Sequence, residues 1–335
     1  MKYIYDDLED KSILVTGGAG FIGSNLVKYL NKHHPKAKVV VFDRFCDNSC
    51  FANGNPTSLG HFKNLIDFKG EIIIGDIAKG SDLERLDEYR FDYIFHEAAI
   101  SDTTCLNQEL VLKTNYESLD YFINKAKNDN AALIYASSAA VYGNSPAPNA
   151  VGSGERPENV YGYSKWLMDK KLREMIAKID DDDNDEADNF KIIALRYFNV
   201  YGNGEYFKGT TASMILQLAQ QIKAYKKVRL FEFGEQMRDF VYVKDVIQAN
   251  IKAIEAQKSG IYNVGSGKAR SFNDIIAILK THFGEFEVEY IKNPYTFYQN
   301  HTEADISETQ KDLFYEPRYS LEDGIGDYIE TLKGL

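Results

Sequence analysis

Cysteine is scarce in this sequence, with three residues in 335: Cys46, Cys50 and Cys105. A small, odd number of cysteines argues against a disulfide framework. Cys46 and Cys50 have no second pair of candidate ligands elsewhere, which also argues against a zinc site. The sequence therefore predicts reduced thiols, a cytoplasmic location and no bound metal.

Long hydrophobic runs are also missing. The N-terminal MKYIYDDLEDK has no apolar signal core, and no uninterrupted apolar run reaches the roughly 20 residues that cross a membrane. Basic charge is in deficit, with 39 Lys and Arg against 50 Asp and Glu, a net charge of −11. We therefore expect a soluble protein that binds neither nucleic acid nor an anionic membrane, and any anionic ligand would need a local basic pocket.

Part of the negative charge lies in one run, DDDDNDEADN at 180–189. Such a run repels itself and has little apolar surface to bury, so we expect a solvated loop. Calcium binding is the alternative, but the run lacks the spaced ligands and the turn glycine of a calcium loop.

What the sequence does contain is a repeated alternation of short apolar runs and longer amphipathic ones. Five runs are expected to form strands buried on both faces: 12–17, 38–43, 71–76, 93–98 and 132–138. Helical patterns lie between most of them, as at 21–33 and 106–127, whereas 45–70 is expected to begin as a long loop. This order predicts an α/β fold with a doubly wound parallel sheet of Rossmann type.

The rhythm changes after a sixth strand expected within 191–202. Shorter strand-like runs then mix with helical patterns at about 211–225, 245–256 and 272–283. We therefore predict a dinucleotide-binding domain formed mainly by residues 1–202. A smaller α/β substrate-binding lobe would be formed mainly by 203–335, interleaved with the last strands of the sheet.

A glycine-rich motif, TGGAGFIG at 16–23, follows the first strand and opens a helix. Gly18, Gly20 and Gly23 satisfy the G-x-G-x-x-G spacing, and Gly17 begins a second register. Glycine lets the backbone turn tightly and approach a pyrophosphate, which then lies on the helix N-terminus. The spacing alone is a weak signal, but its place between a strand and a helix predicts a nicotinamide dinucleotide rather than an empty glycine turn.

The end of the second strand bears on which dinucleotide is bound. Asp43 lies ~20 residues beyond the motif, where an acid that binds the ribose and favours NAD is expected. Arg44 follows it and could pair with a 2′-phosphate, with added charge from Lys63, which favours NADP. Arg44 could instead be a surface residue, so we predict NADP with NAD as the alternative. The other predicted cofactor contacts are Phe21, Ile22, Asp76, Ile77, Glu97, Ala98, Ala99, Thr114, Asn115 and Val200.

A tyrosine and a lysine in ENVYGYSKWLMDK, 158–170, share one helix face because Tyr161 and Lys165 are four residues apart. Tyr163 points elsewhere and is expected to pack or to border the substrate. A free phenol has a pKa of ~10, and a nearby ammonium and an oxidised nicotinamide both favour the tyrosinate. Ser138, at the end of the fifth strand, can donate a hydrogen bond to a substrate oxygen. A purely structural Tyr–Lys pair is the alternative.

Taken together, TGGAGFIG, YASSAAVYG and YGYSK resemble the extended short-chain dehydrogenase/reductases that act on nucleotide sugars, over nearly the whole chain. The related 4,6-dehydratases usually carry an Asp–Glu pair where this chain has Ala139 and Ala140, which argues against dehydration. Three longer segments, 95–104, 195–214 and 230–246, closely resemble the ADP-glyceromanno-heptose 6-epimerase family.

This resemblance implies an isomerase that inverts C6 of the heptose in ADP-D-glycero-D-manno-heptose for synthesis of a lipopolysaccharide core precursor. A 6-ketone would form transiently while NADP takes and returns the hydride. Because the ketone must present its other face, a second acid/base is useful. The resemblance gives that role to Lys208 across from Tyr161, although an exposed loop lysine is the alternative. Ser138 would polarise the oxygen, and Lys165 would hold the ribose and tune Tyr161.

The resemblance also implies the substrate contacts. Arg238 would bind the diphosphate, because a guanidinium can form two parallel bonds to phosphate, or else it forms a salt bridge on the lobe. The other contacts implied are Ser101, Ser138, Asn199, Thr210, Gln217, Phe231, Glu232, Gly234 and Tyr298. The family often has Gly–Ser and a histidine where this chain has Gly209–Thr210 and Gln217. A homo-oligomer, a pentameric ring, is also implied.

Two other interpretations stay open at this point. The chain could be an epimerase or reductase of the same fold that acts on another nucleotide sugar. It could also be a cofactor-sensing protein that has lost catalysis, against which the complete set of Ser138, Tyr161 and Lys165 argues.

Overall fold

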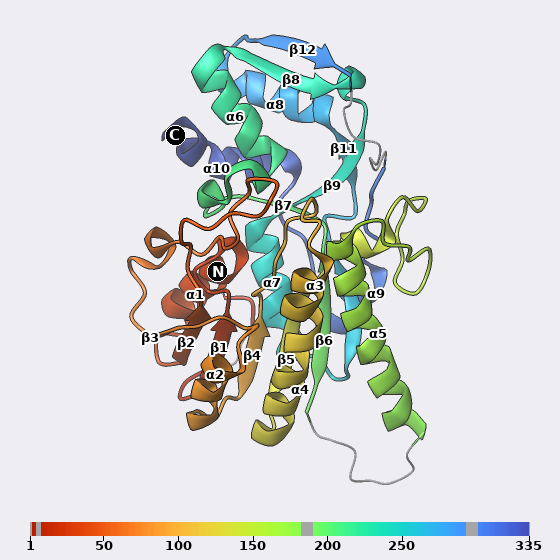
Figure 1. Ribbon diagram of the computed structural model, residues 1–335. Coiled ribbons are helices and arrows are strands. Elements are labelled where there is room, and N and C mark those ends of the chain that lie inside the picture. Colours follow the sequence, from red (N-terminus) through yellow and green to blue (C-terminus); the bar gives the residue numbers. More distant parts are fainter. Residues whose placement is uncertain (1, 5–7, 182–189, 293–300, 335) are drawn as a thin grey trace.

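A seven-stranded parallel sheet forms the centre of the larger domain in the computed structural model, which describes residues 2–4, 8–181, 190–292 and 301–334 (Figure 1). The strand order is β10–β6–β5–β4–β1–β2–β3, and every neighbouring pair is parallel. The strands are β1 (Ser12–Thr16), β2 (Lys38–Asp43), β3 (Glu71–Ile74), β4 (Tyr93–His96), β5 (Ala132–Ser138), β6 (Ile192–Tyr197) and β10 (Gly260–Val264). The predicted doubly wound parallel sheet is confirmed.

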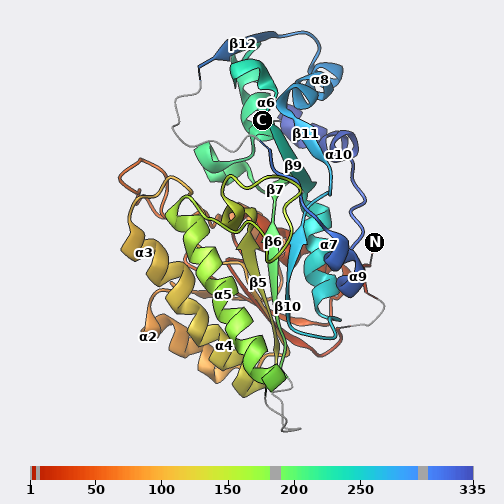
Figure 2. The same ribbon diagram turned by 90° about the vertical axis from the view of Figure 1, so that its right-hand side faces the viewer.

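Helices cover both faces of this sheet because successive strand residues point to opposite sides. Ile13 and Val15 of β1 pack into the core under two helices, and Leu14 packs into the core under several others. The first face is covered by α1 (Phe21–His33) and α7 (Val243–Ala253). The second face is covered by α2 (Gly80–Leu83), α4 (Ser118–Asp129) and α5 (Val160–Asp181), as Figure 2 shows for α4 and α5.

Strand β3 differs from the prediction that it is buried on both faces. Ile72 is 43% exposed and Ile74 is 64% exposed. The strand lies at the edge of the sheet, and the chain that leads into it forms a long loop with only one short 3₁₀ turn, η1 (Phe62–Leu65). No full crossover helix covers this side of the strand in the described residues. Ile72 and Ile74 therefore remain in contact with solvent.

The helix expected at 106–127 is also not uniform. It consists of α3 (Gln108–Leu112), a π-helical turn η3 (Lys113–Glu117), and α4. A π turn inserts an extra residue and locally rotates the side chains, and such turns occur frequently at functional sites. Here the turn contains Thr114, which lines the cavity described below.

In its described residues, the smaller lobe contains two short sheets and three helices around a core of its own. Its strands are β7 (Asn199–Tyr201), β8 (Lys227–Phe231), β9 (Met237–Tyr242), β11 (Ala269–Ser271) and β12 (Glu287–Ile291), and its helices are α6 (Met214–Tyr225), α8 (Phe272–Phe283) and α10 (Leu321–Gly334). The described residues also contain four further 3₁₀ turns, two in each part of the molecule: η2 (Glu84–Glu88), η4 (Ala139–Tyr142), η5 (Tyr206–Thr211) and η6 (Glu232–Gly234). Figure 1 shows the lobe above the carboxyl ends of the large sheet.

The chain passes between the two parts more than once. After β9 it returns to the large domain to form α7 and β10, and it then enters β11 of the lobe. Helix α9 (Ser307–Leu313) lies beside the large sheet, where the Thr309 hydroxyl donates to the Asn263 carbonyl of β10 at 2.7 Å. The boundary at residues 202 and 203 stays a prediction, and residues 243–264 belong spatially to the sheet.

Helix α5 ends at Asp181, so nearly all of the acidic run at 180–189 lies outside the described residues. None of the helices in the described ranges is both long enough and apolar enough to cross a membrane.

Candidate active site

A cavity of about 520 Å³ lies at the carboxyl ends of the large sheet, where Phe240 and Phe272 of the lobe close it from above. Many residues that the sequence singles out line this one cavity. They are Gly17, Gly20, Phe21, Ile22, Gly23, Asp43, Arg44, Asp76, Ile77, Glu97, Ala98, Ala99, Ser101, Thr114, Ser138, Tyr161, Lys165, Asn199, Val200 and Lys208. Open α/β sheets bind ligands at this edge, so the cavity is the candidate active site.

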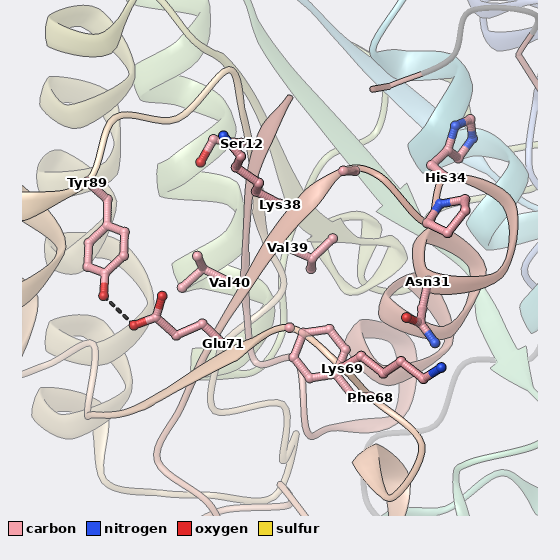
Figure 3. A pocket seen from close by; sticks show the side chains of 13 residues that line it. Ser12, Asn31, His34, Lys38, Val39, Val40, Phe68, Lys69, Glu71 and Tyr89 are labelled. Carbon is pink, nitrogen blue, oxygen red and sulfur yellow. Dashed lines mark hydrogen bonds between the residues drawn. The ribbon is translucent and has the colours of Figure 1, made fainter. Parts of the chain in front are cut away.

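A second hollow, of about 430 Å³, lies at the amino ends of the strands (Figure 3). It is bordered by the first residues of three strands, Ser12, Lys38 and Glu71, and Glu71 accepts a hydrogen bond from the Tyr89 hydroxyl. None of the predicted site residues lines it. Its place at the amino ends of the strands sets it apart from the usual ligand position.

The glycine motif has the geometry that a pyrophosphate requires. Gly17 has a φ of +66°, and a Cβ there would lie 2.8 Å from the Ala98 nitrogen. A Cβ on Gly23 would lie 2.3 Å from the Gly17 carbonyl oxygen, so helix α1 can start close to β1 only with glycine at this position. The N-cap Gly20 supplies no side-chain cap, and the first turn of α1 has no acidic residue. The helix N-terminus can therefore accept an anion.

Asp43 is buried beneath the glycine loop rather than open to solvent. One carboxylate oxygen accepts the Ala19 amide at 2.9 Å, and the other accepts the Phe45 amide at 2.7 Å. A Cβ on Gly60 would lie 2.2 Å from the same carboxylate, so the following loop packs directly on it. Burial raises the pKa of Asp43, although the two amides and Arg44 act in the opposite direction.

Arg44 lies at the rim of the cavity with 36% of its side chain exposed. Its guanidinium is 3.4 Å from the Asp76 carboxylate and also donates to the Thr57 hydroxyl. Two predicted cofactor residues do not line the cavity. Lys63 is exposed on η1, and Asn115 bonds the amide and carbonyl of Ile100, at 2.8 and 3.0 Å, behind the cavity wall.

Tyr161 and Lys165 lie on the same face of α5, as their spacing predicts. The Lys165 ammonium is 6.0 Å from the centre of the Tyr161 ring and donates to the Ala136 carbonyl at 2.6 Å. Burial raises the pKa of Tyr161, whereas a hydrogen bond with Ser138 lowers it and the Glu97 charge raises it. Tyr163 is 43% exposed and stacks on Trp166, with 5.8 Å between the ring centres.

A buried ionic network supports this face of α5 and was not predicted from the sequence. Arg196 of β6 is fully buried, and its guanidinium lies 2.7 Å from both the Asp169 and the Glu155 carboxylates. Asp169 also accepts the Ser137 hydroxyl at 3.0 Å, so it ties α5 to β5 one turn beyond Lys165. An available signal was a lone arginine within the apolar strand IIALRY.

Glu97 is a second carboxyl group in the cavity wall. Its carboxylate accepts the Tyr197 hydroxyl at 2.8 Å. Burial raises the pKa of Glu97 to about 7, while the Tyr197 hydrogen bond and Lys165 lower it. Burial likewise lowers the pKa of Lys165 to about 8, against the charges of Glu97 and Asp169. The two groups can thus change protonation state near neutral pH.

We expect Glu97→Gln to stabilise the cofactor-free protein at pH 8. The pKa of Glu97 rises from 4.5 to about 7 on folding, so between these pH values the folded state binds more protons and wild-type stability falls as pH rises. Glutamine has no such proton, and it keeps an acceptor for Tyr197. The gain in unfolding free energy should be roughly 2 kcal/mol at pH 8 and should shrink towards pH 5.

Urea unfolding at the two pH values measures this difference. Glu88→Gln, at an exposed carboxylate, serves as the control and should show little change at either pH. A stability gain for Glu97→Gln that is equal at pH 5 and pH 8 would contradict the assignment of a raised pKa.

Lys208 lies on η5 and lines the same cavity as Tyr161 of α5. Its side chain is half-buried, with the ammonium 5.4 Å from the centre of the Phe21 ring. The buried carboxylate of Glu205 accepts the Gly202 amide at 3.0 Å and the Ser213 amide at 2.6 Å, which anchors both ends of the segment. Burial lowers the pKa of Lys208, and the Glu205 charge raises it.

Several substrate contacts implied by the resemblance do not line the cavity. Arg238 is buried on β9, where its guanidinium is 5.8 Å from the Phe272 ring and donates to the Met237 carbonyl. The side chains of Thr210 and Gln217 form hydrogen bonds within the protein. Gln217 donates to the Thr210 and Ala212 carbonyls at 3.2 and 2.8 Å, and the Thr210 hydroxyl donates to Asn55. Phe231, Glu232 and Gly234 lie on β8 and η6 of the lobe. Tyr298 lies outside the described residues.

Other lining residues were not predicted individually from the sequence, although several lie within YASSAAVYG or the segments 95–104, 195–214 and 230–246. They are Phe51, Pro56, Thr57, Ser58, Leu59, Gly60, Gly75, Ala78, Ile100, Asp102, Thr103, Leu110, Thr211, Ala212, Ser213, Met214, Phe240 and Phe272, with Phe42, Ala136, Ser137, Tyr197 and Phe198 from strand ends. Many belong to the long loop after β2 or to the segment around η5.

Comparison with known proteins places the fold and the cavity in a family. The model of the NAD dependent epimerase/dehydratase family matches residues 13–265, and the chain belongs to this family. The crystal structure of Helicobacter pylori ADP-L-glycero-D-manno-heptose-6-epimerase is similar over 100% of both chains, with 55% sequence identity and a TM-score of 0.91. The resemblance that the motifs indicate is thereby confirmed.

Two more distant epimerases share the architecture. The UDP-N-acetylglucosamine 4-epimerase of Methanobrevibacter ruminantium, in complex with UDP-N-acetylmuramic acid, is 28% identical with a TM-score of 0.81, over 97% of this chain and 98% of that one. The UDP-glucuronic acid 4-epimerase of Bacillus cereus, in complex with UDP-glucuronic acid and NAD, is 26% identical with a TM-score of 0.78, over 96% and 99%. A nicotinamide dinucleotide is thus a supported cofactor class for this fold.

Proposed function

We propose that this protein is an isomerase that inverts C6 of the heptose in ADP-D-glycero-D-manno-heptose to give ADP-L-glycero-D-manno-heptose. One observation carries the proposal: Tyr161 of α5 and Lys208 of η5 line the same cavity as the glycine motif. Inversion through a ketone uses one acid/base for each orientation of the oxygen. The 55% identity to the Helicobacter pylori heptose 6-epimerase favours this sugar over the other nucleotide sugars.

The residues of the cavity divide the proton transfers between two sites. The glycine loop and the N-terminus of α1 would hold a nicotinamide dinucleotide, which would supply reversible hydride transfer at C6. Tyr161 would take the hydroxyl proton in one orientation while the Ser138 hydroxyl holds the oxygen. After the ketone turns, the Lys208 ammonium would supply the proton. Lys165 would bind the ribose and favour the tyrosinate through its charge.

The direct test is incubation with ADP-D-glycero-D-manno-heptose in deuterated water, followed by proton NMR. We expect the inverted sugar, with the original hydrogen retained at C6, because the hydride never exchanges with solvent. UDP-N-acetylglucosamine serves as the comparison sugar and should remain unchanged. Absence of inverted heptose defeats the proposal, and solvent deuterium at C6 would indicate a carbanion instead of a ketone.

NADP is the cofactor we propose, with NAD as the alternative. Both carboxylate oxygens of Asp43 already accept backbone amides, and Gly60 packs against them. This carboxylate is poorly placed to bind a ribose hydroxyl, whereas the Arg44 guanidinium lies at the rim, partly exposed, and a guanidinium suits a 2′-phosphate.

Arg44→Leu should therefore weaken NADP binding by about tenfold, since a charge-assisted hydrogen bond to phosphate contributes on the order of 1.5–3 kcal/mol. NAD binding should change less than twofold. Calorimetric titration of the cofactor-free protein measures both affinities. Arg90→Leu is the matched control, because Arg90 is exposed and lies just before β4, at the amino ends of the strands and away from the cavity. An equal loss for both cofactors would assign Arg44 a structural role.

We further propose that the protein acts in the cytoplasm as a homo-oligomer and supplies a lipopolysaccharide precursor, as the family resemblance implies. Light scattering coupled to size-exclusion chromatography tests the assembly, for which a pentamer is expected.

A further inference from the structure

The long loop after β2, residues 44–61, covers the cofactor side of the cavity with Phe51 and with residues 56–60. The same loop also touches the η5 segment at two residues, Phe207 and Thr210, which lie on either side of Lys208. The two halves of the candidate site are therefore physically joined.

The first contact is an aromatic stack. The rings of His61 and Phe207 are parallel within 4°, with 3.6 Å between their centres. The His61 amide donates to the Ala19 carbonyl of the glycine motif at 3.0 Å. The ring of Phe207, the residue before Lys208, thus stacks on the ring of His61, and the backbone of His61 is hydrogen-bonded to the glycine motif.

The second contact is a hydrogen-bonded chain through Asn55. The Thr210 hydroxyl donates to the side-chain oxygen Oδ1 of Asn55 at 2.6 Å. The side-chain nitrogen Nδ2 of Asn55 donates in turn to the buried carboxylate of Asp102 at 2.9 Å. Asp102 follows β4 and also lines the cavity, so Asn55 bridges a strand end to the segment that carries Lys208.

We propose that Asn55 and His61 are positioning residues for Lys208, so that the loop which covers the cofactor also fixes the second acid/base. This inference rests on the proposed function of Lys208. A lysine has many rotamers, and Lys208 sits in the short 3₁₀ turn η5, outside any strand. The contacts of the Phe207 ring and the Thr210 hydroxyl hold the chain on both sides of Lys208 and so restrict where its ammonium can lie. A displacement of about 1 Å in a reacting group can lower the rate on the order of 10²-fold.

Asn53 offers a matched control in the same turn of the loop. Its amide also donates to the Asp102 carboxylate, at 2.7 Å, and to the Thr104 hydroxyl at 2.8 Å. Asn53 shares the anchor at Asp102 with Asn55, and its side-chain oxygen accepts the Asn55 backbone amide at 3.0 Å. Asn55→Ala removes the bonds to Thr210 and Asp102, whereas Asn53→Ala leaves the Asn55 side chain and its bond to Thr210 in place.

Epimerisation of ADP-heptose by Asn55→Ala should show a kcat about tenfold lower. The KM and the amount of cofactor bound per protomer should be unchanged. Asn53→Ala should stay within twofold of wild type in all three quantities. His61→Ala should resemble Asn55→Ala, and His61→Phe, which keeps a ring for the stack, should restore most of the kcat.

The decisive measurement combines each change with Lys208→Met. If Asn55 and His61 act through Lys208, adding Asn55→Ala to Lys208→Met should cause no further loss. A further tenfold loss, a loss in proportion to released cofactor, or equal effects of Asn55→Ala and Asn53→Ala would each overturn the proposal. Failure of the wild-type protein to invert the heptose would instead reject the proposed function.

Discussion

Tyr161→Phe is expected to lower the kcat for epimerisation by about 10³-fold, because general acid–base groups contribute 10²–10⁴-fold. The phenol is half-buried on α5, where it is hydrogen-bonded to Ser138 and lies near Lys165. Phenylalanine keeps the ring and its packing, so the fold and the bound cofactor should persist. The loss would therefore belong to proton transfer and not to stability.

Tyr163→Phe is the control for this prediction. Tyr163 is 43% exposed and stacks on Trp166, so removal of its hydroxyl should change kcat less than twofold. Turnover is followed by NMR of the two heptose epimers, and cofactor content by release from the protein. If both variants lost activity equally, or if Tyr161→Phe kept most of its rate, Tyr161 would not be the acid/base.

Lys208→Met should lower the kcat by about 10²-fold, within the range for one general acid–base group. Methionine approximates the length of the aliphatic stem, so the packing over Phe21 is retained. The rate of oxidation should fall for one heptose epimer and not for the other. The epimer whose hydroxyl faces Tyr161 should still be oxidised in a single turnover, and the epimer that faces Lys208 should not.

Single-turnover absorbance of reduced nicotinamide, measured with each epimer, detects this asymmetry. Lys226→Met changes an exposed lysine at the end of α6 and should leave both half-reactions intact. Unimpaired epimerisation by Lys208→Met would exclude Lys208 as the second acid/base.

The fold was predictable where burial forces a regular pattern. Central parallel strands such as β1 and β5 are covered on both faces, so they appear as continuous apolar runs between helical patterns. Strand β3 has the same run, Glu71–Ile74, yet lies at the edge. Periodicity within a strand does not encode its neighbours, which is why its exposure could not be foreseen.

The site was predictable where a motif follows a strand end or a helix face. Gly17, Ser138 and Tyr161 are of this kind, and all three line the cavity. Asn55 and Asp102 are not, because their roles depend on hydrogen bonds between segments 47 residues apart. Loops such as 44–61 have no periodicity, so which of their side chains meet a distant segment becomes known only from the fold.

The repeated passage of the chain between sheet and lobe has a consequence for dissecting the molecule. A fragment that stops at residue 202 would lack β10 and α7, and the backbone of β6 would become an open edge. The apolar side chains on one sheet face would lose the part of their cover that α7 supplies. We therefore expect that residues 1–202 do not fold as a self-contained unit.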